Sequence, residues 1–223
     1  MLEIILIRHG QTDWNRDRRI MGHRPVPLNP RGRDEAQRVA RHLKKIPLDA
    51  IFTSPMLRAV ETAEFLIGER GLKIRLTADL AEIDYGLWVG KTFDEVMEEE
   101  AYTVYHRTPR HAHPPGGEKM TEVRRRAVGF IEGLRGKYQK GRIAVVSHAD
   151  VIKTILVHYL GMDLNYLQKF RIDNTSLSLL WFQKNISRVM AVNCPTVPKK
   201  LFSPTDQVHA KVVRRGGPRK GPR

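Results

Sequence analysis

Two short apolar runs, far apart in the chain, place the strongest constraint on its fold. Residues 4–7 and 143–146 are each four apolar residues long, which is too short for a helix or a membrane span and typical of strands buried on both faces. His9 follows the first run, directly after Arg8, and His148 follows the second. Buried strands of this kind form parallel sheets, in which ligands bind at the carboxyl ends. We therefore expect both histidines to lie in one crevice at that end of the sheet.

A third strand-like run, residues 49–53, leads to a predicted helix start. Ser54 is expected to be the N-cap and Pro55 the first helical residue. Arg58 would then lie in the first turn, where a cation is unfavourable beside the helix dipole. We therefore expect Arg58 to bind an anion rather than to stabilise the helix.

Segments with helical spacing alternate with strand-like segments along the rest of the chain. Besides the helix that contains Arg58, helices are expected at residues 32–45, 93–105, 120–138 and 151–160. Further strands are expected at residues 72–76, 176–182 and 188–192. This order predicts an α/β fold, a three-layer α/β/α sandwich with a mostly parallel sheet and helices on both faces.

Composition indicates one cytoplasmic domain, expected at residues 1–198. The chain has 223 residues, 41% of them hydrophobic, and no apolar run is long enough to cross a membrane. A lone cysteine, Cys194, cannot form an internal disulfide, which fits a reducing compartment. The first strand begins at the N-terminus, so no leader peptide is expected.

The segment 199–223 is strongly basic. It holds eight Lys or Arg and one acidic residue, and so carries about half of the net charge of +15. This composition predicts a disordered tail. Nucleic acid would bind only through this tail. We do not expect such binding, because the tail has no aromatic residue other than Phe202 that could stack on bases. Solubilisation is the preferred interpretation; a rival hypothesis is that the tail folds over the crevice and attracts anionic substrates.

Five separated motifs resemble the histidine phosphatase superfamily, which contains the cofactor-dependent phosphoglycerate mutases. They agree with the family in type, order and spacing over residues 2 to about 192. The resemblance implies a phosphoglycerate mutase-like fold. The motifs are Arg8-His9-Gly10, Ser54-Pro55-Met56-Leu57-Arg58-Ala59, Leu80-Ala81-Glu82-Ile83-Asp84-Tyr85-Gly86, Pro115-Gly116-Gly117-Glu118 and Val146-Ser147-His148.

The resemblance also implies a role for six residues. His9 would be the catalytic nucleophile that becomes a phosphohistidine, and Glu82 would be the proton donor. The substrate phosphate would be held by the four others: Arg8, Asn15, Arg58 and His148.

Phosphoryl transfer requires positioning and charge stabilisation, which two guanidinium groups supply at any working pH. His9 must attack as neutral imidazole, and the nearby arginines would oppose its protonation. Glu82 would need a raised pKa to protonate the leaving oxygen. This chemistry needs no metal or other cofactor, and the chain has no metal-binding motif. His106, His111 and His113 lie close together in the sequence; an exposed lid is the preferred interpretation, and a metal cluster is the alternative.

The segment between Glu82 and His148 is expected to select the substrate. The resemblance implies a longer insertion here in the mutases and a shorter one in the phosphatase branch, and this chain has the shorter form. We therefore expect a phosphomonoester hydrolase acting on a small phosphorylated metabolite, resembling the broad-specificity and alpha-ribazole-type phosphatases. A cofactor-dependent phosphoglycerate mutase and a phosphoryl- or nucleic-acid-binding protein with secondary catalysis are the alternatives. The oligomeric state stays open, with a homodimer as one possibility.

The candidate pocket walls are Trp88, Phe93, Tyr102 and Tyr105, for which core packing is an equal alternative.

Four positions depart from the family pattern. Val89 and Asp150 replace residues that are usually acidic and small, respectively. Lys119 stands where serine is usual, and Arg24 where the residue is usually acidic or small. Lys119 and Arg24 suggest an additional anionic group on the substrate, with surface variation as the simpler explanation.

Overall fold

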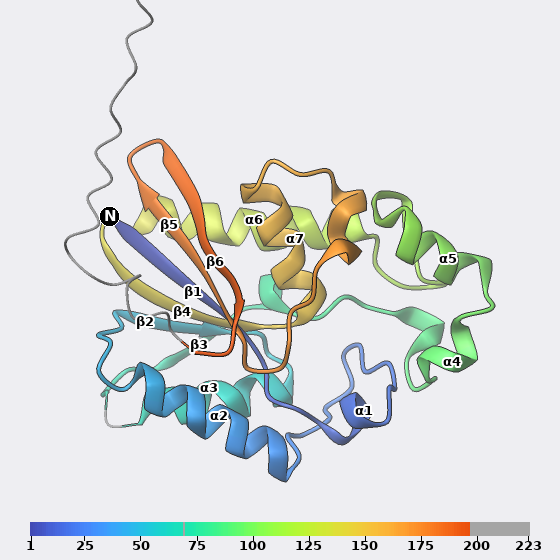
Figure 1. Ribbon diagram of the computed structural model, residues 1–223, viewed down its shortest axis with the longest axis horizontal. Coiled ribbons are helices and arrows are strands. Elements are labelled where there is room, and N and C mark those ends of the chain that lie inside the picture. Colours follow the sequence, from blue (N-terminus) through green and yellow to red (C-terminus); the bar gives the residue numbers. More distant parts are fainter. Residues whose placement is uncertain (69, 197–223) are drawn as a thin grey trace, which may run out of the picture.

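The computed structural model describes residues 1–68 and 70–196. Its centre is one six-stranded sheet in the order β3-β2-β4-β1-β5-β6, in which the first four strands are parallel and the last two antiparallel (Figure 1). The strands are β1 (Leu2–Arg8), β2 (Ala50–Thr53), β3 (Ile74–Leu76), β4 (Gly141–Ser147), β5 (Leu177–Gln183) and β6 (Ile186–Cys194). This confirms the predicted α/β fold with a mostly parallel sheet.

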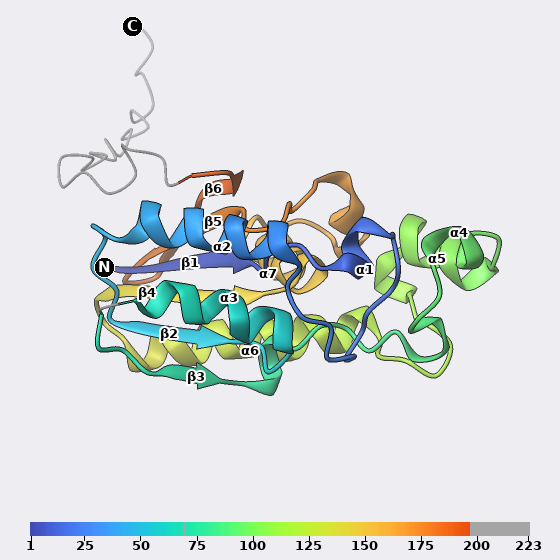
Figure 2. The same ribbon diagram turned by 90° about the horizontal axis from the view of Figure 1, so that it is seen from below.

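The long helices cover both faces of the sheet. Helices α2 (Pro30–Leu43) and α3 (Leu57–Ile67) lie on one face, and α6 (Met120–Lys137) and α7 (Ala149–Tyr159) lie on the other (Figure 2).

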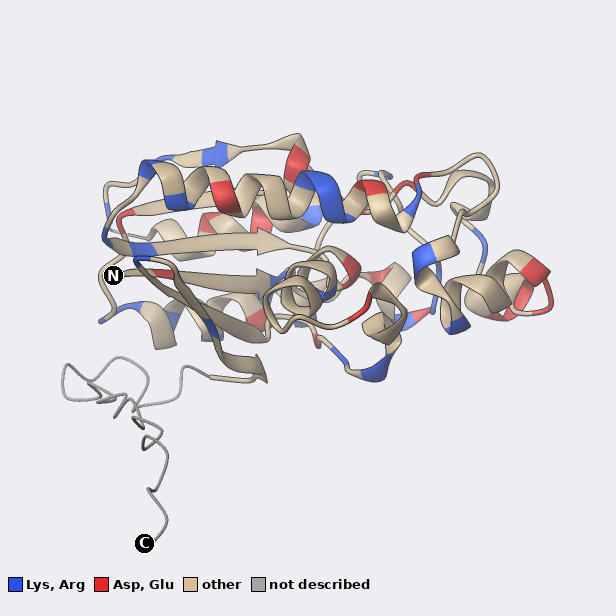
Figure 3. Cartoon of the chain, turned by 90° about the horizontal axis from the view of Figure 1, so that it is seen from above, with Lys and Arg blue, Asp and Glu red and all other residues tan. Residues whose placement is uncertain are grey.

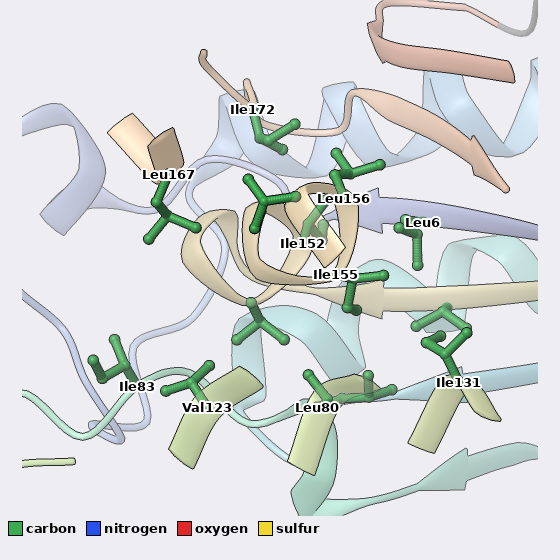
Figure 4. Close-up of a cluster of buried hydrophobic side chains, with 14 of the residues drawn as sticks. Leu6, Leu80, Ile83, Val123, Ile131, Ile152, Ile155, Leu156, Leu167 and Ile172 are labelled. Carbon is green, nitrogen blue, oxygen red and sulfur yellow. The ribbon is translucent and has the colours of Figure 1, made fainter. Parts of the chain in front are cut away.

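Side chains of β1 alternate between two apolar cores, as the period of a strand requires. Ile5 and Ile7 pack with α2 and α3. Leu6 faces the other core, with Ile131 of α6 and Ile152 of α7 (Figure 4). Both faces of β1 are therefore buried, which explains its continuous apolar run.

Short helices gather beyond the carboxyl ends of the parallel strands, which all point toward them in Figure 2. They include α1 (Asp13–Arg16), α4 (Phe93–Val96) and α5 (Glu100–Arg107), with 3-10 turns η1 (Ala78–Leu80), η2 (Gly86–Trp88), η3 (Pro109–His111) and η4 (Leu164–Lys169).

Two predicted helix boundaries were wrong. The helix expected at residues 93–105 is divided, because Glu99 has extended backbone and accepts hydrogen bonds from Trp88 and Lys91. Helix α3 begins at Leu57, and Ser54 is not its N-cap.

No helix within the described residues is long and apolar enough to cross a membrane. The predicted domain boundary at residue 198 and the tail predicted to be disordered lie outside the described residues.

Candidate active site

The two histidines lie side by side because their strands are neighbours. Strands β1 and β4 are parallel, with Arg8 opposite Ser147, so His9 and His148 leave the sheet at the same level. Their ring centroids are 5.1 Å apart. The next strand, β2, leads to α3, and Arg58 lies in the first turn of that helix. The expected crevice therefore forms at the carboxyl ends of three neighbouring strands.

The imidazole of His9 is buried and electrically neutral. Its Nδ1 lies 2.7 Å from the carbonyl oxygen of Gly10. Because a carbonyl oxygen only accepts hydrogen bonds, Nδ1 must carry the ring hydrogen, and Nε2 keeps its lone pair. Burial, followed by the charges of Arg58 and Arg8, lowers the pKa of His9 well below its usual value. Nε2 of His9 can therefore act as a nucleophile over the neutral pH range.

Two arginines are held in place by backbone carbonyl groups. Arg8 donates through Nη1 to the carbonyl oxygen of Ile172 at 2.7 Å, and Arg58 donates through Nη2 to that of Gly22 at 2.9 Å. Burial lowers the pKa of Arg58 to about 10, so it stays cationic at neutral pH. Neither arginine has an ion-paired carboxylate among the described residues, which leaves both charges available to an anion.

His148 is oriented by Ser54. The hydroxyl of Ser54 accepts the backbone N–H of Met56 at 3.2 Å and lies 2.7 Å from Nε2 of His148. This arrangement lets the hydroxyl donate to Nε2, which leaves the ring hydrogen of neutral His148 on Nδ1. Burial, then the charges of Arg58 and His9, lowers the pKa of His148 well below its usual value.

Three buried nitrogen atoms around His9 have no hydrogen-bond partner among the described residues. They are Nε of Arg8, Nε of Arg58 and Nδ1 of His148. A buried donor without a partner costs about 1–3 kcal/mol, so such atoms call for an explanation. A bound anion with several oxygen atoms would satisfy all three with charge-assisted hydrogen bonds.

Glu82 lies beside the histidines as a protonatable carboxyl group. Its Oε1 accepts the N–H of Ile83 at 3.1 Å, and its Oε2 lies 3.6 Å from Nδ1 of His148. Burial, followed by the charge of Asp150, raises the pKa of Glu82 to about 7. Glu82 can therefore hold a proton near neutral pH and donate it, as a general acid must.

Asn15 lines a pocket at this site together with Arg8, His9 and Glu82, whereas Arg58 and His148 are fully buried and do not line it. It forms a capping box with Thr12, in which its Oδ1 accepts the N–H of Thr12 at 3.1 Å. Asn174, which sequence reasoning missed, also lines the pocket and donates to the carbonyl oxygen of His9 at 2.9 Å. Asn174 precedes β5, the strand that pairs with β1. The sequence carries no signal for this contact, because it depends on the pairing of β5 with β1.

The pocket has a volume of about 390 Å³ and is lined by α1, α5, α7 and residues 168–174. Phe93 and Tyr105 line it, as expected. Trp88 instead belongs to the core and donates to Glu99 at 2.6 Å, and Tyr102 packs edge-on against Trp88. Trp88 and Tyr102 therefore do not form part of the pocket wall.

Lys119 and Arg24 do not line the pocket, so the structure gives no support to their predicted contact with the substrate. Lys119 is the N-cap residue of α6, and the carbonyl oxygen of Arg24 accepts a hydrogen bond from Arg58. Within the described residues, no three His, Cys, Asp or Glu side chains are grouped so that they could hold a metal ion.

Residues 4–195 match the family model of the histidine phosphatase superfamily, branch 1. The chain belongs to this family, and it is a phosphatase-type enzyme. It is 30% identical over 195 residues to phosphoserine phosphatase 1 of Hydrogenobacter thermophilus, covering 86% of this chain and 92% of that protein. It is also 35% identical over 159 residues to phosphoglycerate mutase-like protein 4 of Arabidopsis thaliana, covering 69% of each. Among solved structures, a putative alpha-ribazole-5'-P phosphatase from Escherichia coli has a TM-score of 0.81 at 28% identity, covering 88% of this chain and 98% of that one.

Proposed function

We propose that this protein is a metal-independent phosphomonoesterase that hydrolyses a small phosphorylated metabolite through a phosphohistidine at His9. The observation that carries the proposal is the group of three partnerless buried donors, on Arg8, Arg58 and His148, around a neutral imidazole. Such donors suit the equatorial oxygen atoms of a phosphoryl group in transfer. A nucleophile and a protonated carboxyl group lie in the same pocket.

In the first step, Nε2 of His9 attacks the phosphorus atom while the bond to the alcohol oxygen breaks. Glu82 gives its proton to that oxygen, so the alcohol leaves neutral. Arg8 and Arg58 stabilise the charge on the transferring group. The phosphorylated imidazole still carries its Nδ1 hydrogen, and the hydrogen bond to the carbonyl oxygen of Gly10 stabilises its positive charge.

In the second step, water enters where the alcohol has left. The carboxylate of Glu82 takes a proton from the water as its oxygen attacks phosphorus. The bond between phosphorus and Nε2 breaks, which releases inorganic phosphate and returns His9 to the neutral form. Each turnover thus consumes one water molecule and restores the proton on Glu82.

A phosphoglycerate mutase is the second candidate, since several relatives carry mutase names, among them a probable phosphoglycerate mutase that is 31% identical over 188 residues. A mutase would return the phosphoryl group to a second hydroxyl rather than to water. The short segment between Glu82 and His148 supports hydrolysis. A binding protein with secondary catalysis would not require His9 and Glu82 together.

The test combines two assays on the purified protein, with a metal chelator present. Phosphate release is measured from a panel of phosphomonoesters, and interconversion of 3- and 2-phosphoglycerate is measured with and without a bisphosphoglycerate primer. The proposal predicts phosphate release without interconversion. Primer-dependent interconversion would identify a mutase, and loss of phosphate release on chelation would contradict metal independence.

A further inference from the structure

The pocket extends from the phosphate site along one face of α7. Ala149, Asp150 and Lys153 all line it, and their spacing of three and four residues places them on the same side of the helix. Lys153 lies five residues beyond His148, which is about 7 Å along the helix axis. Lys153 is therefore placed where the alcohol part of a bound phosphomonoester would lie.

The ammonium group of Lys153 is mostly shielded from water. Its side chain is 11% exposed. Nζ donates to Oε1 of Gln168 at 2.8 Å and lies 3.4 Å from Oδ1 of Asp150. An ammonium group has three N–H donors, and these are the two acceptors that the described part of the chain provides. The third donor is available to a ligand in the pocket.

Asp150 holds Lys153 in place, and its carboxylate accepts hydrogen bonds from the protein's own side chains. Its Oδ2 accepts the hydroxyl of Tyr85 at 2.8 Å and also that of Tyr105. Asp150 is buried, and its pKa is lowered by Lys153 and both tyrosines despite the opposing effect of burial. Its carboxylate is thus saturated by groups of the protein, which fixes the position of the ammonium group.

Other cations surround the same part of the pocket. Arg18, Arg19 and Arg171 line it, and basic segments, with acidic segments among them, lie around this end of the sheet (Figure 3). Arg171 is paired with Asp173 in solvent, where an ion pair contributes little. Lys153 is less exposed, and an anion bound there would form a stronger hydrogen bond than one at the rim.

We propose that Lys153 binds a second anionic group, a carboxylate or a phosphate, on the alcohol part of the substrate. The enzyme would therefore prefer phosphomonoesters of anionic alcohols to those of neutral alcohols. This inference rests on the proposed phosphomonoesterase activity. It assigns to Lys153 the contact that the sequence suggested for Lys119 and Arg24.

Matched substrate pairs test the preference in the unaltered protein. The first pair is 3-phosphoglycerate and glycerol 1-phosphate, which differ by a carboxylate. The second pair is propane-1,3-diol bisphosphate and 3-hydroxypropyl phosphate, which differ by a phosphate. We expect kcat/KM to be at least about tenfold higher for the anionic member of one pair, as one charge-assisted hydrogen bond would give. The pair that shows the difference identifies the anionic group, and equal values within both pairs would overturn the inference.

Variants then test whether Lys153 is the cause. Lys153→Met should lower the ratio of anionic to neutral kcat/KM about tenfold, and Lys153→Arg should restore much of it. Lys169→Met removes the same charge from an exposed position outside the pocket and should leave the ratio unchanged.

A double variant covers the case in which Lys153→Met leaves Asp150 unpaired and fails to fold. Asp150→Asn with Lys153→Met removes both charges together and keeps the net charge constant. It should also lose the preference; a retained preference in a folded variant would overturn the inference. Hydrolysis of p-nitrophenyl phosphate, measured alongside, separates the Lys153 inference from the proposed phosphomonoesterase activity. If the unaltered enzyme hydrolyses neither p-nitrophenyl phosphate nor any substrate of the two pairs, the proposed activity itself is contradicted.

Discussion

At the scale of single residues, the site holds a base and an acid that are both uncharged near neutral pH. Burial and two arginines keep the imidazole of His9 neutral. Burial and the charge of Asp150 keep the proton on Glu82 up to about pH 7. Opposite pKa shifts of this kind separate a nucleophile from a general acid.

Glu82 should set the alkaline limit of activity. Its folded-state pKa is about 7, so the donating form is lost as pH rises through that value, and kcat/KM for alkyl phosphates should fall above it. Glu82→Gln should lower kcat by about 10²–10⁴-fold and abolish the alkaline decline. For p-nitrophenyl phosphate kcat/KM should be affected less, because this parameter reports the first step, in which the leaving group needs no proton. The measurement is a pH profile of both enzymes on both substrates; a wild-type rate that stays constant up to pH 9 would exclude this role.

Some residues of the site could be predicted from the sequence, and others could not. The pairing of His9 with His148 follows from two apolar runs, and Arg58 from its place at a helix start. Asn174 could not be found in this way, because it reaches the site only through the antiparallel pairing of β5 with β1. Asp150 was noticed as a departure from the family, but its partner Lys153 was not.

At the scale of elements, the loop after β1 rests directly on the first turn of α2. Asn29 caps α2, accepting the N–H of Gly32 at 2.8 Å. A Cβ atom on Gly32 would lie 2.0 Å from the backbone oxygen of Gln11. Only glycine allows this approach, which fixes the loop that carries His9 and Gly10.

Gly32→Ala should therefore destabilise the protein and disturb the site. We expect the free energy of unfolding to fall by about 1–3 kcal/mol, as for other overpacked positions, together with a loss of activity. Gly133→Ala is the matched control, since Gly133 lies in α6 with open space around it. That substitution should raise the unfolding free energy by about 0.5–1 kcal/mol. Urea denaturation measures both; equal midpoints would show that the contact of α2 with the loop is unimportant.

Strands and helices could be predicted where the apolar residues of the segment itself show the pattern. The runs of β1 and β4 and the long helices appear near their expected positions. The break between α4 and α5 was not predictable, because it depends on contacts of Glu99 with Trp88 and Lys91. The start of α3 was misplaced because the hydroxyl of Ser54 bonds to Met56 and to His148, both outside α3, while Met56 takes the N-cap position.

At the scale of the whole molecule, the sheet order brings together residues that are up to about 165 positions apart in the chain. Strands β2, β4 and β1 are adjacent, and β5 closes the site from the other side of β1. Each contributes groups at one end of the sheet, so the site depends on the complete fold.

The basic segment 199–223 is a property of the whole chain, and it lies outside the described residues. If it serves solubility, its deletion should leave kcat/KM unchanged in low salt. The measurement is kcat/KM of the truncated and complete chains in low and high salt. A decrease in low salt that disappears in high salt would support electrostatic attraction of substrates instead.

The proposed reaction requires His9 to carry the phosphoryl group during turnover. The most direct test mixes the enzyme with a labelled phosphomonoester, quenches the reaction in alkali within milliseconds, and locates the label by peptide mapping. We expect an acid-labile phosphoryl group on His9, none on a His9→Ala variant, and no turnover by that variant. A label on another residue, or turnover by His9→Ala above a few per cent of wild type, would contradict it.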